Sequence, residues 1–185
     1  TIKPQSSVYG DDVIVKNDMF EVSGVIEGDD LKISLATDNA ARYAGKYDIV
    51  GEWNNSNYNV TFVGGEKAYE ITAKSIVVEI ENKASFYGEK DVALSAIPKC
   101  ELVYNDSLDS LGIKLVREEG KNAGTYAITL DSWTNKNYTI TAENANYTVK
   151  RLTLRAIVAN ATSVYDDALA NLTFTIEGSF AEGEN

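Results

Sequence analysis

The sequence SIVVEIENKASFYGEKD, at residues 75–91, joins an alternating segment to a Tyr-Gly turn. Ile76, Val78 and Ile80 fall on one face of this segment, and the glutamates between and after them fall on the other. This alternation predicts a β-strand with one buried face. The turn at Tyr87-Gly88 then ends the run, and the rest of the chain repeats the same order of features.

A tyrosine followed by a turn recurs at equal distances along the chain. The tyrosines are Tyr9, Tyr87 and Tyr165, so the spacings are 87 − 9 = 78 and 165 − 87 = 78. A fixed period of this kind predicts a tandem array of one small domain. The predicted units are a first repeat with a truncated first strand, a second repeat and the first half of a third, at residues 1–73, 74–152 and 153–185.

Composition narrows the function classes. The chain has 185 residues, with 17 basic and 28 acidic side chains and a net charge of −11, which opposes binding to nucleic acid. It has no histidine, which removes imidazole zinc sites and histidine-based triads, and one cysteine, which removes intrachain disulfides. No apolar run reaches the length of a membrane span. We expect no enzyme activity, no cofactor and no metal centre.

The remaining patterns predict strands almost throughout. Segments 19–25 and 98–104 are predicted strands of looser pattern, and the third repeat carries the inward row Leu154, Ala156 and Val158. The predicted class is therefore all-β, with sandwich-like (Ig-like) or β-grasp-like repeats arranged end to end.

A glycine two residues before a tyrosine occurs once in each complete repeat. Gly45 precedes Tyr47, and Gly124 precedes Tyr126. We predict positive φ at both glycines and core positions for both tyrosines.

The last two strands of each repeat are predicted to form a hairpin. Tyr58 begins the outgoing strand of the first repeat, which returns through Gly64-Gly65, and Tyr138 begins that of the second, which returns through Glu143-Asn144. Gly-Gly between alternating apolar residues is a hairpin signal.

Each repeat also carries an acidic turn between strands. It lies at residues 27–31 in the first repeat and 104–108 in the second, and Glu177-Gly178 begins a similar feature in the third. In the second repeat, residues 106–111 predict a single helical turn capped by Asp106.

These motifs, taken in order, resemble the MBG-type (YGX-type) repeats of long bacterial surface proteins and adhesins. The second repeat carries the resemblance through Tyr87-Gly88, then residues 122–128, 137–140 and 147–149. The first repeat matches through Tyr9-Gly10, Gly28-Asp29, residues 44–47, 57–60 and 69–72. One departure is Asp166, which stands where the family has glycine.

The resemblance implies an exported, secreted or wall-anchored protein of the bacterial cell surface. Its repeats would serve as stalk modules or take part in cell adhesion, with neighbouring repeats as partners and host glycan or glycoprotein, such as mucin, as a possible ligand. It supplies no catalytic residues.

The two tryptophans are the best candidates for a ligand site. Trp53 and Trp133 each lie five residues before the tyrosine of an Asn-Tyr pair, among asparagines. An indole ring could stack on a sugar while the amides bind its hydroxyls; the alternative is that each tryptophan closes the end of a small core. The asparagines of this candidate site are Asn55, Asn57, Asn135 and Asn137.

Pairs of acidic residues are candidates for a second kind of site, one that binds calcium. Asp11-Asp12, Asp29-Asp30 and Asp166-Asp167 could bind calcium, but no loop has the spacing of an EF-hand, which favours solvated turns. Glu118-Glu119 could suggest a glycosidase, but such a pair must flank a cleft. Two functions therefore stay open: a spacer module, and a module that binds glycan directly.

Overall fold

The computed structural model describes residues 1–37 and 41–184, and its contacts group the chain into two units. Unit 1 contains Thr1–Glu79, Ile97–Lys114 and Asp131–Ala142, and unit 2 contains Ile80–Ala96, Leu115–Leu130 and Glu143–Asn185. The described residues form strands and a single short helix. The all-β prediction is confirmed.

Five strands of unit 1 come from the first part of the chain. They are β1 (Gln5–Val8), β2 (Ser34–Thr37), β3 (Gly45–Tyr47), β4 (Ile49–Glu52) and β5 (Tyr69–Thr72). In one sheet β5 is central, pairing parallel with β1 and antiparallel with β3, while β2 and β4 form a separate antiparallel pair. Alternation places Tyr69 and Ile71 of β5 in the core.

A second sheet has the order β11-β6-β8. Its strands are β6 (Lys74–Ile80), β8 (Ala96–Pro98) and β11 (Tyr138–Glu143). The buried side chains of β6 are Ile76, Val78 and Ile80, as the alternation predicts.

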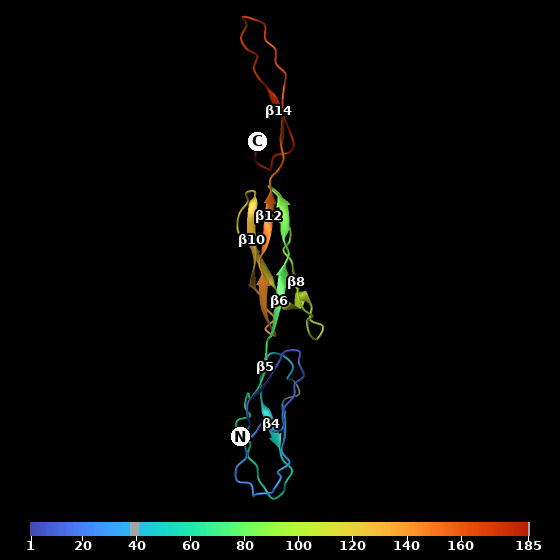
Figure 1. Ribbon diagram of the computed structural model, residues 1–185, viewed down its shortest axis with the longest axis vertical. Coiled ribbons are helices and arrows are strands. Elements are labelled where there is room, and N and C mark those ends of the chain that lie inside the picture. Colours follow the sequence, from blue (N-terminus) through green and yellow to red (C-terminus); the bar gives the residue numbers. More distant parts are fainter. Residues whose placement is uncertain (38–40, 185) are drawn as a thin grey trace. The chain divides into compact units, whose positions relative to one another are not determined.

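The four-stranded sheet has the order β7-β12-β10-β9, and Figure 1 shows β12 beside β10. Its strands are β7 (Lys83–Phe86), β9 (Lys114–Arg117), β10 (Gly124–Ser132) and β12 (Ala145–Lys150). Ile128, Tyr147 and Val149 fill its core. A further antiparallel pair joins β13 (Arg155–Val158) to β14 (Phe174–Glu177).

Strand pairing recurs at the predicted period. The parallel pair β1–β5 places Ser7 opposite Ile71, and the parallel pair β7–β12 places Ser85 opposite Val149. Both positions differ by the same amount, 85 − 7 = 78 and 149 − 71 = 78. The repeat boundaries and the end-to-end arrangement stay predictions.

The hairpin prediction is wrong for the second repeat. β11 hydrogen-bonds to β6, whereas its successor β12 hydrogen-bonds to β7 and β10 in the other sheet. The turn at Glu143-Asn144 therefore passes the chain from one sheet to the next instead of folding it back on its neighbour. In the first repeat, β5 likewise pairs with β1 and β3, and residues 58–62 form no named strand.

The predicted inward row of the third repeat is also wrong. Leu154, Ala156 and Val158 are exposed. Among the described residues, β13 pairs with β14 alone, and a two-stranded ribbon has no opposing layer to bury one of its faces.

Several local expectations need correction. Gly45 and Gly124 begin strands and have no positive φ. Segment 19–25 contributes a single bridge, Ile2 to Phe20, and the strand predicted at 98–104 is β8, which ends at Pro98.

The predicted helical turn exists as α1 (Leu108–Leu111), but its cap differs. Ser107 caps it: its Oγ accepts from the N–H of Ser110, whose own hydroxyl accepts from the N–H of Ser107. Asp106 is thereby left for a different role.

Candidate functional site

The tryptophans predicted to bind sugar are tied to the chain in the same way. The indole Nε1 of Trp53 donates to the carbonyl of Tyr58 at 3.0 Å, and that of Trp133 donates to the carbonyl of Tyr138 at 2.9 Å. Trp53 remains 39% exposed and also contacts Phe62, with ring centroids 6.2 Å apart. Each indole therefore closes its own loop, and Trp53 keeps part of its ring accessible.

The asparagines beside Trp53 hold the loop from within. Asn55 Nδ2 donates to the carbonyl of Asp30 at 3.0 Å, and its Oδ1 accepts from the N–H of Asn57 at 3.0 Å. Both ends of this amide are thus engaged. Asn57 is exposed.

The asparagines beside Trp133 repeat this arrangement. Asn135 Nδ2 donates to the carbonyl of Ser110 at 3.3 Å, and its Oδ1 accepts from the N–H of Asn137 at 3.0 Å. Asn137 Oδ1 in turn accepts from the N–H of Ala44 at 2.9 Å. Both loops therefore use asparagine to satisfy backbone groups. Ligand binding by these residues stays a prediction.

The tyrosine that follows each tryptophan donates to an acid. Tyr58 Oη donates to Asp29 Oδ2 at 2.5 Å and accepts from the N–H of Ile26 at 3.2 Å. Tyr138 Oη donates to Asp106 Oδ2 at 2.8 Å and accepts from the N–H of Val103 at 3.1 Å. The hydrogen bond to Asp29 raises the pKa of Tyr58, because it stabilises the neutral phenol.

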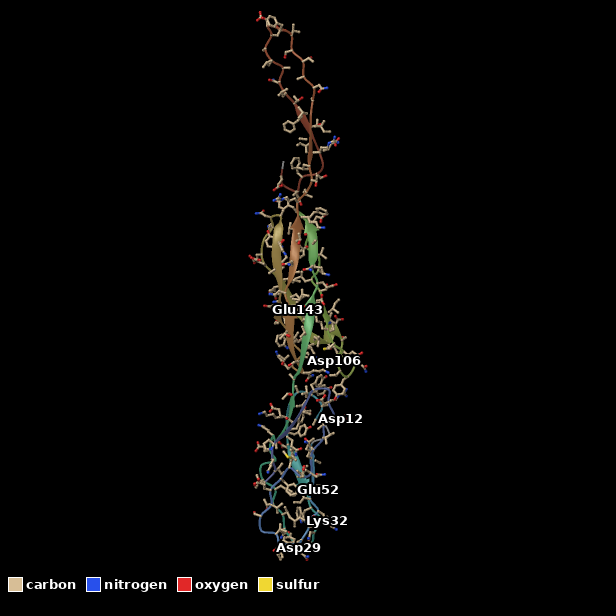
Figure 2. All side chains as sticks on the ribbon, viewed as in Figure 1. Asp12, Asp29, Lys32, Glu52, Asp106 and Glu143 are labelled. Atoms are coloured by element: carbon tan, nitrogen blue, oxygen red, sulfur yellow. The ribbon has the colours of Figure 1, made fainter. Side chains whose placement is uncertain are left out.

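Asp106 accepts a second phenol. Tyr9 Oη donates to the same Oδ2 at 3.0 Å, and Tyr9 and Tyr138 are both 2% exposed. Burial, followed by the bond to Asp106, raises the pKa of Tyr9; burial also raises the pKa of Tyr138 to about 12. Figure 2 labels Asp106 and Asp29, the two acids that accept these tyrosines.

Aromatic rings surround Tyr9 on several sides. Tyr104 and Tyr138 each meet it edge-on at 5.3 Å between centroids, and Tyr43 stacks at 6.4 Å. The Arg42 guanidinium lies over the Tyr104 ring, 4.1 Å from its centroid. Packing of this kind adds to area burial and fixes the position of the Tyr9 hydroxyl.

The other motif tyrosines are also internal ties. Tyr47 Oη donates to the carbonyl of Tyr43 at 2.8 Å, and Tyr126 Oη donates to the carbonyl of Asn122 at 2.7 Å. Both rings were predicted to face the core, and both are half-buried. Tyr165 is 96% exposed.

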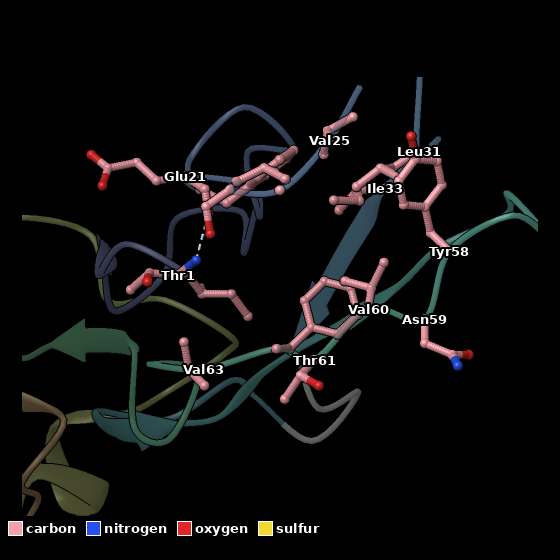
Figure 3. A pocket seen from close by; sticks show the side chains of 16 residues that line it. Thr1, Glu21, Val25, Leu31, Ile33, Tyr58, Asn59, Val60, Thr61 and Val63 are labelled. Atoms are coloured by element: carbon pink, nitrogen blue, oxygen red, sulfur yellow. Dashed lines mark hydrogen bonds between the residues drawn. The ribbon is translucent and has the colours of Figure 1, made fainter. Parts of the chain in front are cut away.

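Unit 1 also contains a cavity of about 230 Å³. Figure 3 shows Ile33, Tyr58 and Val60 around it, and the amino group of Thr1 donating to the carbonyl of Glu21 at 2.5 Å. Its lining is largely aliphatic and aromatic, and Glu21 is the one carboxylate among the residues that form it. The cavity therefore brings no two carboxylates together.

The carboxylates of one acidic pair, Asp29-Asp30, accept hydrogen bonds. Asp30 Oδ1 accepts from the N–H of Lys32 at 2.8 Å, next to the Asp29–Tyr58 bond. Across residues 1–37 and 41–184, no group of three or more acidic, cysteine or histidine side chains is placed to hold a metal ion. Within the same ranges, no helix has the length and apolarity to cross a membrane.

Sequence patterns identified the tryptophan loops but did not identify Asp106 as the acceptor of the tyrosine that follows the Trp133 loop. Local spacing made Asp106 a helix cap. Its Oδ1 accepts from Ser110 Oγ at 3.4 Å, but the tyrosines that donate to its Oδ2 lie 97 and 32 residues away. A signal existed in the tandem period, because an acid follows both Tyr9 and Tyr87 by 97 residues.

Comparison with known proteins gives one family match. Residues 76–148 match the MBG domain (YGX type). Comparison with curated proteins and with solved structures gives no match. The matched segment begins at the buried alternation of β6 and runs through the Tyr-Gly turn, the Trp133 loop and most of β12. Residues 76–148 therefore match the family that the repeated motifs predict, the MBG domain of the YGX type.

Proposed function

We propose that this chain is a non-catalytic repeat module of a bacterial surface protein and acts as a spacer. The YGX-type MBG domain is a repeat module of surface proteins. The spacer role, the bacterial surface location and the repeat nature of residues 1–73 and 153–185 are parts of the proposal.

One observation carries it: the side chains best suited to bind a ligand are already used to hold the fold. The indole N–H groups of Trp53 and Trp133 each donate to a backbone carbonyl. The side-chain amides of Asn55 and Asn135 each donate one hydrogen bond to the backbone and accept another from it. If such a group must break its internal hydrogen bond before it binds a ligand, the free energy of that bond is subtracted from the affinity. Repetition of the same bonds in two loops favours a structural purpose common to both.

A second candidate function is direct binding of host glycan or glycoprotein. It is favoured by the exposed 39% of Trp53 and by the neighbouring exposed Asn57. A ring edge and a free amide are a minimal sugar contact, and repetition along a surface array would add avidity.

A binding assay on the whole 185-residue chain separates the two. The chain is passed over immobilised mucin and a broad glycan panel, beside a Trp53→Phe, Asn57→Ala variant that keeps an aromatic ring in the loop. The spacer predicts no saturable binding by either folded protein. Saturable binding by the parent and its loss in the variant would replace the spacer with the glycan-binding function.

A further inference from the structure

The Tyr-Gly turn of the first predicted repeat, Tyr9-Gly10, contacts residues of the second predicted repeat. The residues on both sides of this contact belong to unit 1. Tyr9 donates to Asp106, and the N–H of Asp106 donates to the carbonyl of Val103 at 2.9 Å, which forms the turn that receives it. Gly10 has a φ of +99°, and a Cβ there would lie 2.6 Å from Val103 Cγ1. Both residues of the Tyr-Gly motif are therefore needed at this contact.

The same contact occurs in unit 2. Tyr87 Oη donates to Glu184 Oε1 at 2.6 Å, and the N–H of Glu184 donates to the carbonyl of Ala181 at 3.0 Å. Gly88 has a φ of +82°, and a Cβ there would lie 2.7 Å from Ala181 Cβ. The receiving turn therefore lies at residues 181–184. The sequence had predicted it at Glu177-Gly178, so that prediction is wrong.

All the contacting positions are related by one offset. The acids give 184 − 106 = 78, the apolar residues give 181 − 103 = 78, and the tyrosines give 87 − 9 = 78. Two occurrences at one offset indicate a repeated joint, in which a Tyr-Gly turn docks on an acidic turn.

A third acidic turn has the receiving geometry. The N–H of Asp29 donates to the carbonyl of Ile26 at 3.1 Å, the same turn as at Val103 and Asp106. Tyr58 bridges the acid and the N–H of Ile26, as Tyr138 bridges Asp106 and the N–H of Val103.

Ile26 occupies the place of Val103, and its side chain is 71% exposed. Among the described glycines, none has Ile26 beside its Cβ position in the way that Gly10 has Val103. The turn is therefore preformed and open.

We propose that Ile26, Asp29 and Tyr58 form a docking site for the Tyr-Gly turn of another YGX-type repeat. The tyrosine hydroxyl would donate to the Asp29 carboxylate, whose oxygens accept more than one hydrogen bond. The glycine would pack on the Ile26 side chain. This deepens the proposed function and rests on it, because it names the partner of the repeat module.

The chain's own third turn is a poor occupant. Tyr165 is exposed, but Asp166 follows it with a φ of +77° and carries a side chain where the other two turns have glycine. At the occupied joints a Cβ in this position already collides with the receiving turn. We therefore expect the docking site to select for glycine, and we expect that two copies of this chain do not join through residues 164–167.

A chain extended by one repeat tests the proposal. Ile2 occupies the place of Ile80, and 80 − 2 = 78, so a copy of residues 1–78 placed directly before Thr1 keeps the period and leaves all 185 residues intact. The readout is methyl NMR of Ile26 in the original chain, not of the Ile26 in the added copy. Two quantities are measured: the broadening of this methyl signal by a soluble paramagnetic agent, and its nuclear Overhauser contact with the α-protons of the added Gly10.

In the extended chain we expect the contact to appear and the broadening of Ile26 to fall to that of Val103. Gly10→Ala in the added copy alone, or Asp29→Ala in the original chain, which removes the acceptor, restores the broadening while the added repeat stays folded by its own spectrum. An Ile26 methyl as accessible in the extended chain as in the parent would overturn the proposal. The glycan assay would still decide the spacer function by itself.

Discussion

The joints at Tyr9 and Tyr87 use one motif in two environments. Tyr9 is buried, shares its acid with Tyr138 and has Tyr104 and Tyr43 against its ring. Tyr87 is half-buried and donates to an exposed glutamate. The comparison teaches that the Tyr-Gly motif fixes where a turn docks, whereas the surrounding rings decide how much stability the docking contributes.

Truncation of the two tyrosines should give the largest difference. We expect Tyr9→Ala to lower the free energy of unfolding of unit 1 by about 3 to 5 kcal/mol, because a fully buried ring and a hydrogen bond are lost. Tyr87→Ala should change unit 2 little, because water replaces its bond. Urea unfolding followed by tryptophan fluorescence reports on unit 1, and amide exchange of β12 reports on unit 2. Equal losses would show that ring burial is not what separates the joints.

Removal of the acids should give the next largest difference. Asp106→Ala leaves two buried phenols without their acceptor, which should cost about 2 to 4 kcal/mol. Glu184→Ala should be nearly silent, because its partner can donate to water. The check is the urea midpoint of each variant against Asp106→Asn, which keeps an acceptor oxygen and should recover part of the loss. A silent Asp106→Ala would contradict the shared-acceptor geometry.

Gly10→Ala should cost less and can be separated into two causes. Positive φ costs an L-residue about 1 to 2 kcal/mol, and the collision with Val103 adds about 1 kcal/mol or more. Gly28→Ala is the matched control, because Gly28 has a φ of +93° with open space around it and so isolates the backbone cost. Thermal or urea midpoints of the two variants should differ; identical losses would show that Val103 yields freely.

A further effect is expected in alkaline solution. Folding raises the pKa of Tyr138 from 10.0 to about 12, so the folded state holds the phenol proton more tightly than the unfolded state. This contribution is complete below pH 10 and is lost as the pH rises through about 12. Unit 1 should therefore lose stability over this window, and the loss should be shallower in Tyr138→Phe. A slope unchanged in that variant would assign the alkaline loss to other groups.

Local patterns predicted local features and failed where partners are distant. The alternation of Ile76, Val78 and Ile80 depends only on one face of the strand being buried, so the sequence predicts β6 correctly. The outgoing and returning strands at Tyr138 and Tyr147 have equally clear alternation, but the pattern cannot say that they join different sheets. For the same reason the row at Leu154 was predicted buried, because its pattern contains no information on whether an opposing layer covers it.

The candidate site shows the same limit. The sequence located both tryptophan loops and their asparagines, but not that the amides bond to backbone groups such as the carbonyls of Asp30 and Ser110. Asp106 was assigned by its neighbours in sequence, whereas Tyr9 and Tyr138 determine what it does. Only the 78-residue period contained this long-range information, in the constant distance from a tyrosine to an acid.

The parallel pairing of β1 with β5, and of β7 with β12, has a mechanical consequence. In each pair an early strand of a repeat lies beside its last strand over four register positions, Gln5 to Val8 in one case and Lys83 to Phe86 in the other. Tension along the chain pulls the start of the first strand and the end of the last strand in opposite directions. The hydrogen bonds between parallel strands then bear the load together, in shear, and do not open one after another. A repeat tied in this way resists extension until the whole ladder fails at once.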